Sequence, residues 1–482
     1  MNLSSRKRKF SHIILALLIS TALLVNLSAA TLQSKSSDDA KDETTNVTYD
    51  LLIISPKKFS RYLILLVEHK NNHEVKTIQV NTEEIYQQLF LEGKDEAEKI
   101  KYFIKAAIEN WEIKYVLLVG GRKGQGYKEK WWVPVRYTYL NRNYEKYSEG
   151  KFLTDLYFAD IYDAEGNFSS WDTNNNGIFG EWPKNSSAAD IPDLYPDVCV
   201  GRLPCRNVFD VKIIVNKIIK YETGSFDDSW FKKMVVVAGD TYPKKTPGFI
   251  DGEIHTQRAL ENMTDFTPVK LYTSDGSLKN WVDIVRAINK GCGFVFFSGH
   301  GGPHLWLNNF PGTKNKTASI HLRHMNFLIN KNKLPVCLSA SGCFNNMFNV
   351  SLTHSEWVYW NGLILQGIKY NIARCWGETL TFKPFGGCIA VIASTAFSYE
   401  SSDISRREGG CEWLDINFFE QYGVNNIDTL GECWGATVSA FLQNFTIDWN
   451  DTSSTGSALI AKNLEQWLLI GDPSLKIGGY SI

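Results

Sequence analysis

The chain has 482 residues, of which 44% are hydrophobic and 21% are charged, and this is enough apolar material for two domains or two large lobes. Its formal net charge is -1, so no excess of basic residues favours nucleic acid or anionic lipid as a partner. We therefore expect a folded protein that does not act on nucleic acid.

The N-terminus has the pattern of an export signal. A basic stretch at residues 6–9 precedes an apolar run at residues 13–25, and small residues at 28–30 offer a cleavage point. The apolar run is short for a membrane-spanning helix. We expect residues 1–30 to be a signal peptide, the mature protein to be secreted or extracellular without a stable membrane span, and residues 31–48 to be a flexible polar leader.

Residues 49–225 are predicted to form an N-terminal α/β lobe. The apolar run "YDLLIISP" stops at a proline and reads as a buried strand. Strand and helix patterns then alternate, and the strands are apolar throughout, which indicates a mostly parallel sheet covered on both faces. The further expected elements are strands at residues 75–80 and 114–121 and helices at residues 59–70 and 95–111.

The segment "WDTNNNGIFGEW" resembles the first half of an EF-hand-type calcium loop. Oxygen-bearing side chains alternate and are followed by Gly177, which permits the turn, although Pro183 stands where the usual last acid would be. An Asn-Gly-rich turn without an ion is the alternative. The expected ligands of a structural Ca2+ are Asp172, Asn174, Asn176, the backbone carbonyl of Ile178, and Glu181, with Asp160 and Asp163 as further sources of oxygen.

Residues 230–480 are predicted to form a second, C-terminal lobe. A long amphipathic helix ends near residue 222, and residues 223–230 form the joint. In open sheets of this kind, ligands bind outside the carboxyl ends of the strands. The expected apolar strands are at residues 232–240, 293–300, 334–342 and 387–395.

Two of these strands are followed by residues suited to nucleophilic catalysis. "GFVFFS" leads into a glycine-flanked His300, and "LPVCLSAS" leads into Gly342 and Cys343. A neighbouring imidazole lowers the pKa of a thiol and later protonates the leaving amine. Glycines around His300 admit a peptide and leave an N–H such as that of Gly301 to bind an oxyanion. The pattern predicts a Cys–His dyad.

Other interpretations of these residues remain open. Cys337 lies inside an apolar run, where a thiol is usually core, and the odd count of nine cysteines leaves at least one unpaired. The non-catalytic alternative is that His300 lies in a structural turn and Cys343 belongs to a disulfide. A metal hydrolase is disfavoured because "HGGPH" is not a helix, and no Gly-X-Ser-X-Gly elbow supports a serine hydrolase. The metal alternative would use His300, His304, His321 and His324.

Together, "SGHGG" and "SGCFNNMF" resemble the catalytic histidine and cysteine segments of the gingipain family of cysteine peptidases, which belongs to the caspase-like clan. The segments "PDVCVGRLP", "CWGETLTF", "GGCIAVIAST" and "GDPSLKI" agree with this family, and the resemblance spans residues 49–480. It implies a caspase-like α/β fold of open, mostly parallel sheets flanked by helices in two lobes, of which residues 230–480 are catalytic. The stretch at 350–373 is longer than in the best-known members.

The resemblance also implies roles for individual residues. Cys343 would be the nucleophile and His300 the general base and acid, with the N–H groups of Gly301 and Cys343 binding the oxyanion. An acidic residue after "MVVVAG" would orient the histidine. Asp240, Asp251 and Glu253 are available, and Glu253 is preferred because a predicted helix follows it. The pocket wall would contain Ser398, Tyr399 and Glu400, whose carboxylate suits a basic side chain.

We therefore expect an exported, gingipain-like cysteine endopeptidase that hydrolyses protein or peptide substrates through a thioester acyl-enzyme, with cleavage after a basic residue. A catalytically silent calcium-binding surface glycoprotein is the competing interpretation, and a disulfide at Cys343 would favour it. A transpeptidase using the same dyad is a third.

Overall fold

The computed structural model describes residues 47–141, 150–224, 227, 229–243, 249–353, 371–401, 409–454 and 456–480, with the backbone of 359–360 and 363–364. The predicted signal peptide and nearly all of the predicted leader lie outside these residues. Among the described helices, none is long and apolar enough to cross a membrane.

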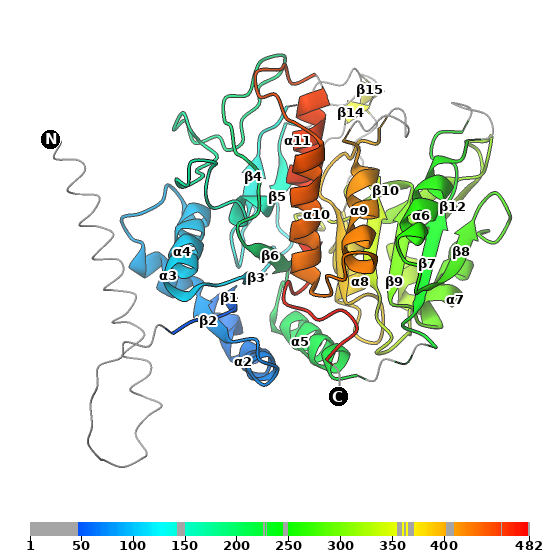
Figure 1. Ribbon diagram of the computed structural model, residues 1–482, viewed down its shortest axis with the longest axis horizontal. Coiled ribbons are helices and arrows are strands. Elements are labelled where there is room, and N and C mark those ends of the chain that lie inside the picture. Colours follow the sequence, from blue (N-terminus) through cyan, green and yellow to red (C-terminus); the bar gives the residue numbers. More distant parts are fainter. Residues whose placement is uncertain are drawn as a thin grey trace, which may run out of the picture.

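A ten-stranded sheet runs through the whole molecule (Figure 1). Its strands are short and apolar, as their sequences predict, and β1, β3, β9, β13 and β16 are buried along their whole length. In spatial order they are β2 (Thr77–Asn81), β1 (Leu51–Ser55), β3 (Tyr115–Val119), β6 (Cys199–Leu203), β17 (Trp467–Ile470), β16 (Ala390–Ser394), β13 (Val336–Ala340), β9 (Phe294–Ser298), β7 (Lys233–Ala238) and β8 (Thr267–Tyr272).

The sheet has two parallel sections that run in opposite directions. Strands β2, β1, β3, β6 and β17 are parallel to one another, and so are β16, β13, β9, β7 and β8. Antiparallel pairing of β16 with β17 joins the sections. A mostly parallel sheet flanked by helices confirms the predicted α/β class. The division into lobes at 49–225 and 230–480 stays a prediction, because one sheet passes through both.

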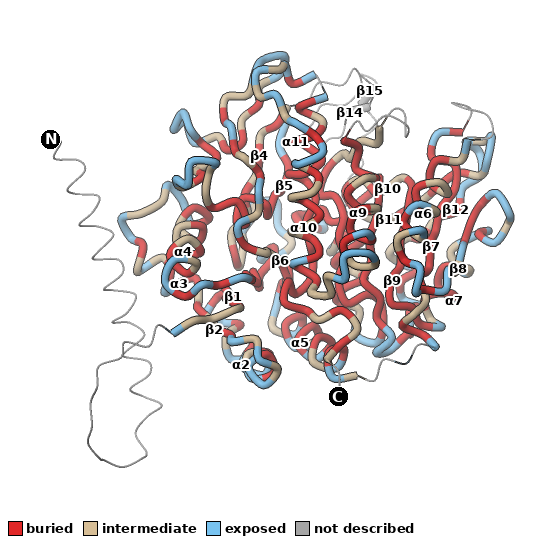
Figure 2. The backbone as a smooth tube through the Cα atoms, in the orientation of Figure 1, coloured by how far each residue is buried: buried red, intermediate tan, exposed pale blue. Residues whose placement is uncertain are grey.

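Helices cover both faces of this sheet, as buried parallel strands require. In Figure 1, α6, α9 and α10 lie on the near face, where they pack on β7, β13 and β6. Figure 2 shows that exposure is concentrated on the outer sides of the helices and in the loops. The helices are α2 (Lys57–Asn71), α3 (Thr82–Gln88), α4 (Glu96–Trp111), α5 (Val208–Glu222), α6 (Asp251–Glu261), α7 (Trp281–Asn289), α8 (Trp376–Thr381), α9 (Cys411–Gly423), α10 (Leu430–Asn444) and α11 (Gly456–Gln466).

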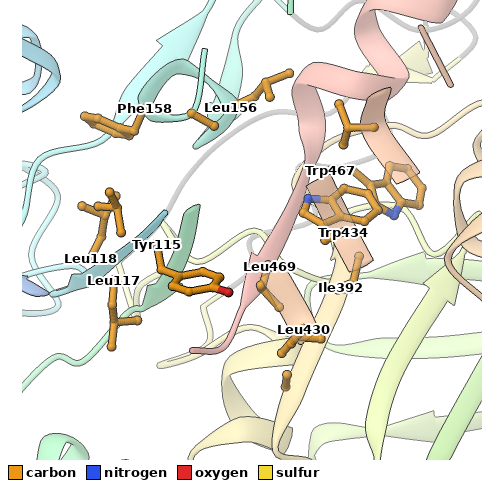
Figure 3. Packing of buried hydrophobic residues seen from close by; sticks show 14 of the residues in the cluster. Tyr115, Leu117, Leu118, Leu156, Phe158, Ile392, Leu430, Trp434, Trp467 and Leu469 are labelled. Carbon is orange, nitrogen blue, oxygen red and sulfur yellow. The ribbon is translucent and has the colours of Figure 1, made fainter. Parts of the chain in front are cut away.

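The junction between the two sheet sections is part of the main hydrophobic core. Figure 3 shows Trp467 and Leu469 of β17 beside Ile392 of β16, with Leu430 and Trp434 of α10 packed over them. All five side chains are buried. Burial of a large apolar side chain contributes about 1.5–3 kcal/mol, so this cluster holds the second section of the sheet against the first.

Small sheets lie outside the main one. Strands β10 (His300–Gly302), β11 (Leu305–Asn309) and β12 (Thr317–His321) form an antiparallel sheet that follows β9 directly. His300 and the two glycines that follow it thus form a short strand, since glycine leaves the extended backbone free to pair. The remaining pairs are β4 (Arg136–Thr138) with β5 (Phe152–Thr154), and β14 (Tyr359–Trp360) with β15 (Leu363–Ile364).

Candidate active site

Cys343 lies in a tight loop just past the carboxyl end of β13. The backbone on both sides of it is left-handed, with φ of 57° at Ser341 and 62° at Phe344. Non-glycine residues rarely adopt this conformation, and such strain gathers at functional sites. Cys343 is half-buried and is not in a disulfide, whereas Cys337 is fully buried inside β13. The loop thus presents the Cys343 thiol and hides that of Cys337.

His300 is the first residue of β10, at the carboxyl end of the neighbouring strand β9. Its Nε2 lies 2.9 Å from the carbonyl oxygen of Thr241. Because a carbonyl only accepts, Nε2 carries the hydrogen and Nδ1 is the basic nitrogen. Burial lowers the pKa of His300, while the Thr241 carbonyl and the Asp251 charge act to raise it. The imidazole is therefore neutral near pH 7, as a general base must be.

The histidine and cysteine segments are in direct backbone contact. The parallel strands β9 and β13 pair up to Ser298 and Ala340. A Cβ built on Gly301 would lie 2.5 Å from the carbonyl carbon of Gly342 and 2.8 Å from the nitrogen of Cys343. No side chain fits in this contact, so glycine is required at 301.

Asn345 ties the two loops together. Its side-chain amide donates to the carbonyl oxygens of Gly302 at 2.8 Å and Leu305 at 3.0 Å, and its oxygen accepts from the Ser339 hydroxyl at 2.8 Å. Asn345 is completely buried. Buried, satisfied amides fix the geometry of the groups they join, so this side chain holds the loop that follows Cys343 against the hairpin that follows His300.

Asp251, at the start of α6, supports His300 indirectly, through the backbone of Thr241. Its Oδ1 accepts the N–H of Thr241 at 2.9 Å. The carbonyl oxygen of Thr241 in turn accepts a hydrogen bond from His300 Nε2. The expectation that Glu253 orients His300 is not met, because Glu253 accepts from the N–H of Ser274 at 3.0 Å and from its hydroxyl at 2.6 Å. Residues two apart on a helix point about 200° apart, so only one of these two carboxylates faces the histidine.

The carboxylate of Asp240, the third acid available, binds a different segment. Its Oδ2 accepts the N–H of Gly312 at 3.2 Å. The connection between Asp251 and His300 therefore runs through the peptide group of Thr241. No sequence pattern identifies such a link.

The predicted pocket wall lies beside Cys343. The hydroxyl of Ser398 is 3.3 Å from the Cys343 sulfur, and the N–H of Ser398 is 3.4 Å from it. Tyr399 is held through its backbone by the side chain of Asn463. The Glu400 side chain is only 4% exposed and accepts a hydrogen bond from Ser341, two residues before Cys343. Two of the three predicted wall residues, Ser398 and Glu400, thus contact the loop that carries Cys343, and Tyr399 lies between them in the sequence.

A buried cluster of Asp251, His255 and Glu400, with two carboxyl groups, adjoins this wall. His255 Nδ1 lies 4.0 Å from Glu400 Oε1, and burial lowers the pKa of His255 to about 3, so this ring is neutral. Burial raises the pKa of Asp251. The pKa of Tyr242 is raised, chiefly by the charge of Glu400. The sequence analysis did not identify Thr241, Tyr242 or His255, because their roles depend on how α6 and its preceding loop pack.

The two expected oxyanion donors differ in their surroundings. The N–H of Cys343 donates to the carbonyl of Ser341 at 2.9 Å, across a three-residue turn. Gly301 belongs to β10, where it pairs with Trp306. A substrate oxyanion would have to replace Ser341 as the partner of the Cys343 N–H, and the role of both donors stays a prediction.

The predicted calcium loop forms a compact turn around Asp172. The Asp172 carboxylate accepts the N–H groups of Asn176 at 2.9 Å and Gly177 at 3.1 Å, in keeping with such a loop. However, the Lys94 ammonium lies 2.6 Å from Asp172 Oδ2. The donor set fits Ca2+ only if Lys94 moves away.

The other predicted ligands of this loop are engaged locally. The side-chain N–H groups of Asn174 and Asn176 face Glu181, at 3.4 and 2.6 Å from its Oε2, and the N–H of Ile178 donates to Asn176. Asp160 accepts from the Trp171 indole at 2.7 Å and Asp163 from the N–H of Asn167 at 2.7 Å, so neither faces the turn. The calcium site stays a prediction.

Comparison with known proteins identifies the family of this chain. The model of Peptidase family C25 matches residues 44–478. Gingipain R2 and gingipain R1 of Porphyromonas gingivalis are each 25% identical to this chain over 296 residues, which is 59% of its length. These matches cover 33% of gingipain R2 and 25% of gingipain R1, so the chain spans a third or less of these relatives.

Solved structures show the same fold. The crystal structure of the Arg specific cysteine proteinase gingipain R (RgpB) has a TM-score of 0.58 at 20% identity and covers 90% of this chain and 79% of that chain. The complex of Porphyromonas gingivalis RgpB pro- and mature domains gives 0.57 at 20% identity, with coverage of 89% and 79%. With the family match over most of its length, the chain belongs to Peptidase family C25, the gingipain family of cysteine peptidases.

Proposed function

We propose that this protein is an exported cysteine endopeptidase that uses Cys343 as nucleophile and His300 as general base and acid. The observation that carries the proposal is the backbone contact of Gly301 with Gly342 and Cys343, which sets the two catalytic segments side by side beyond two adjacent strands. The signal-like sequence of residues 1–30 supports export.

The reaction follows from the orientation of the imidazole. His300 Nδ1 takes the thiol proton as the Cys343 sulfur attacks the scissile carbonyl, and the imidazolium then protonates the leaving amine. A thioester remains, which water hydrolyses with His300 again acting as base. Nε2 keeps its hydrogen on the Thr241 carbonyl throughout, and Asp251 holds that peptide in place through its N–H.

The preferred substrate has a basic residue before the cleaved bond. Glu400 and Asp251 supply buried carboxylates beside the cysteine loop, and His255 between them adds no positive charge. A guanidinium or ammonium group makes charge-assisted hydrogen bonds to such carboxylates, whereas an acidic side chain is repelled. One structural relative is described as Arg specific, which agrees with this preference.

Peptide cleavage tests the proposal. Matched fluorogenic peptides with Arg, Lys, Gln or Glu before the scissile bond are compared by kcat/KM, and we expect Arg and Lys to exceed Glu by at least about 100-fold, the equivalent of one buried charge-assisted hydrogen bond. Cys343→Ala and His300→Ala should abolish cleavage, while Cys337→Ala, which removes a core thiol, should retain it. Cleavage that survives Cys343→Ala would overturn the proposal, and equal rates for Arg and Glu would overturn the specificity.

A further inference from the structure

Three side chains from two separate parts of the chain converge near the loop that carries the candidate nucleophile. Asp251 and His255 are one turn apart on α6, and Glu400 follows β16 in the pocket wall. One ligand atom from each residue lies within 4.8 Å of the others. Among the described residues, this cluster has the geometry of a metal site, and the sequence cluster of His300, His304, His321 and His324 does not.

Two polar atoms of this cluster lack partners. Asp251 is 6% exposed and His255 is 1% exposed, yet neither Asp251 Oδ2 nor His255 Nε2 has a hydrogen-bond partner among the described residues. A buried polar atom without a partner costs about 1–3 kcal/mol. The His255 nitrogen that lies nearest to Glu400 is Nδ1, at 4.0 Å from Oε1, with the Ser298 hydroxyl at 3.3 Å, so the unpartnered Asp251 Oδ2 is the atom of this cluster that indicates a bound ligand.

The chemistry of the donors selects the ligand. One imidazole and two carboxylates are the donor set of sites that hold Zn2+ and related first-row cations, with a fourth position open to solvent or an additional ligand. Calcium and magnesium prefer oxygen ligands alone.

The geometry points to a Zn2+-binding site formed by Asp251, His255 and Glu400, at which the bound cation occupies the space required by a basic substrate side chain and inhibits the peptidase. The inhibitory consequence rests on the proposed function, whereas the metal site itself does not. Glu400 and Asp251 are the carboxylates proposed to pair with the substrate. A divalent cation on them removes their negative charge and therefore competes with arginine or lysine.

Binding is measured without catalysis, in the Cys343→Ala protein, because a cysteine and histidine pair would itself attract zinc. Isothermal titration with Zn2+ should show one site, and Zn2+ should raise the melting temperature. Adding His255→Gln or Glu400→Gln should weaken that site by at least about 100-fold, since even loss of an outer partner of a metal ligand costs 10–100-fold. The control is His321→Gln with His324→Gln, which removes two imidazoles outside the proposed site and should leave the site unchanged.

Inhibition is measured separately in the wild-type protein. Zn2+ should raise KM for an arginine peptide without lowering kcat, a chelator should restore the rate, and the rise in KM should be much smaller in His255→Gln, which keeps the cysteine and histidine pair but lacks one ligand of the proposed site. The metal site is refuted if Cys343→Ala binds no Zn2+, or if binding is equally strong in both His255→Gln and Glu400→Gln variants that melt cooperatively. A protein that binds Zn2+ in this way but cleaves no peptide would retain the metal site and overturn the proposed function instead.

Discussion

Substitution of Gly301 by alanine should separate the two catalytic segments. The new methyl carbon would lie 2.5 Å from the carbonyl carbon of Gly342, 2.6 Å from its Cα and 2.8 Å from the nitrogen of Cys343. Carbon atoms normally approach to about 3.5–4.0 Å, and the atoms in the way are backbone, so the loops must move apart by about 1 Å. Such a displacement costs about 100-fold in rate, which corresponds to about 2.7 kcal/mol of transition-state stabilisation.

The assay is kcat/KM on an arginine peptide, together with the rate at which iodoacetamide alkylates Cys343. Gly302→Ala is the matched control, because a Cβ there would meet only the His304 ring at 3.7 Å, an ordinary contact. We expect a loss of about 100-fold for Gly301→Ala and less than about threefold for Gly302→Ala, with both proteins folded by circular dichroism. Near-normal activity in Gly301→Ala would refute the claim that this contact sets the dyad geometry.

Other perturbations test the surroundings of the site. Glu400→Gln should lower kcat/KM for an arginine peptide by about 10–100-fold, the worth of a hydrogen bond to a charged group, and leave a glutamine peptide unaffected; an equal loss for both would contradict a pocket role. Burial lowers the pKa of His300, so kcat/KM should decline only as pH falls below about 6.5, and an acid limb above that value would contradict a neutral, buried base. The pKa of His255 is about 3 when folded, below that of the unfolded chain, so the unfolded state takes up a proton as pH falls. Urea denaturation should then show the wild type losing stability relative to His255→Gln below about pH 6.5, by up to about 1.4 kcal/mol per pH unit, and parallel curves would contradict this. If Lys94 competes with calcium for Asp172, millimolar Ca2+ should raise the melting temperature of Lys94→Gln more than that of the wild type, and no effect on either would exclude the loop as a calcium site.

The main strands, and the positions of His300 and Cys343 at the ends of two adjacent strands, could be predicted because their signals are local. Apolar runs ended by glycine mark buried parallel strands, and functional groups gather where such strands end, which brought attention to His300 and Cys343. The order of the strands carries no comparable local signal. The last strand, "WLLI" at 467–470, lies between β6 and β16, parallel to β6 and antiparallel to β16. Its partners are decided by packing rather than by its sequence.

The support of the histidine was harder to predict for a physical reason. The link from Asp251 through Thr241 to His300 passes through a peptide group, and any residue type supplies a backbone carbonyl. The choice of Glu253 over Asp251 depended on where α6 begins, and an error of two residues on a helix reverses the direction of a side chain. His255 is one turn beyond Asp251 on α6, in a segment that reads as an ordinary amphipathic helix.

Covalent labelling tests the central claim most directly. The protein is treated with a peptidyl chloromethyl ketone that ends in arginine, and the modified residue is identified by mass spectrometry in the wild type and in His300→Ala. We expect a single adduct on Cys343 that forms far more slowly in His300→Ala and with a probe that ends in glutamate. Recovery of Cys343 in a disulfide-linked peptide, with no adduct from any probe, would contradict the account.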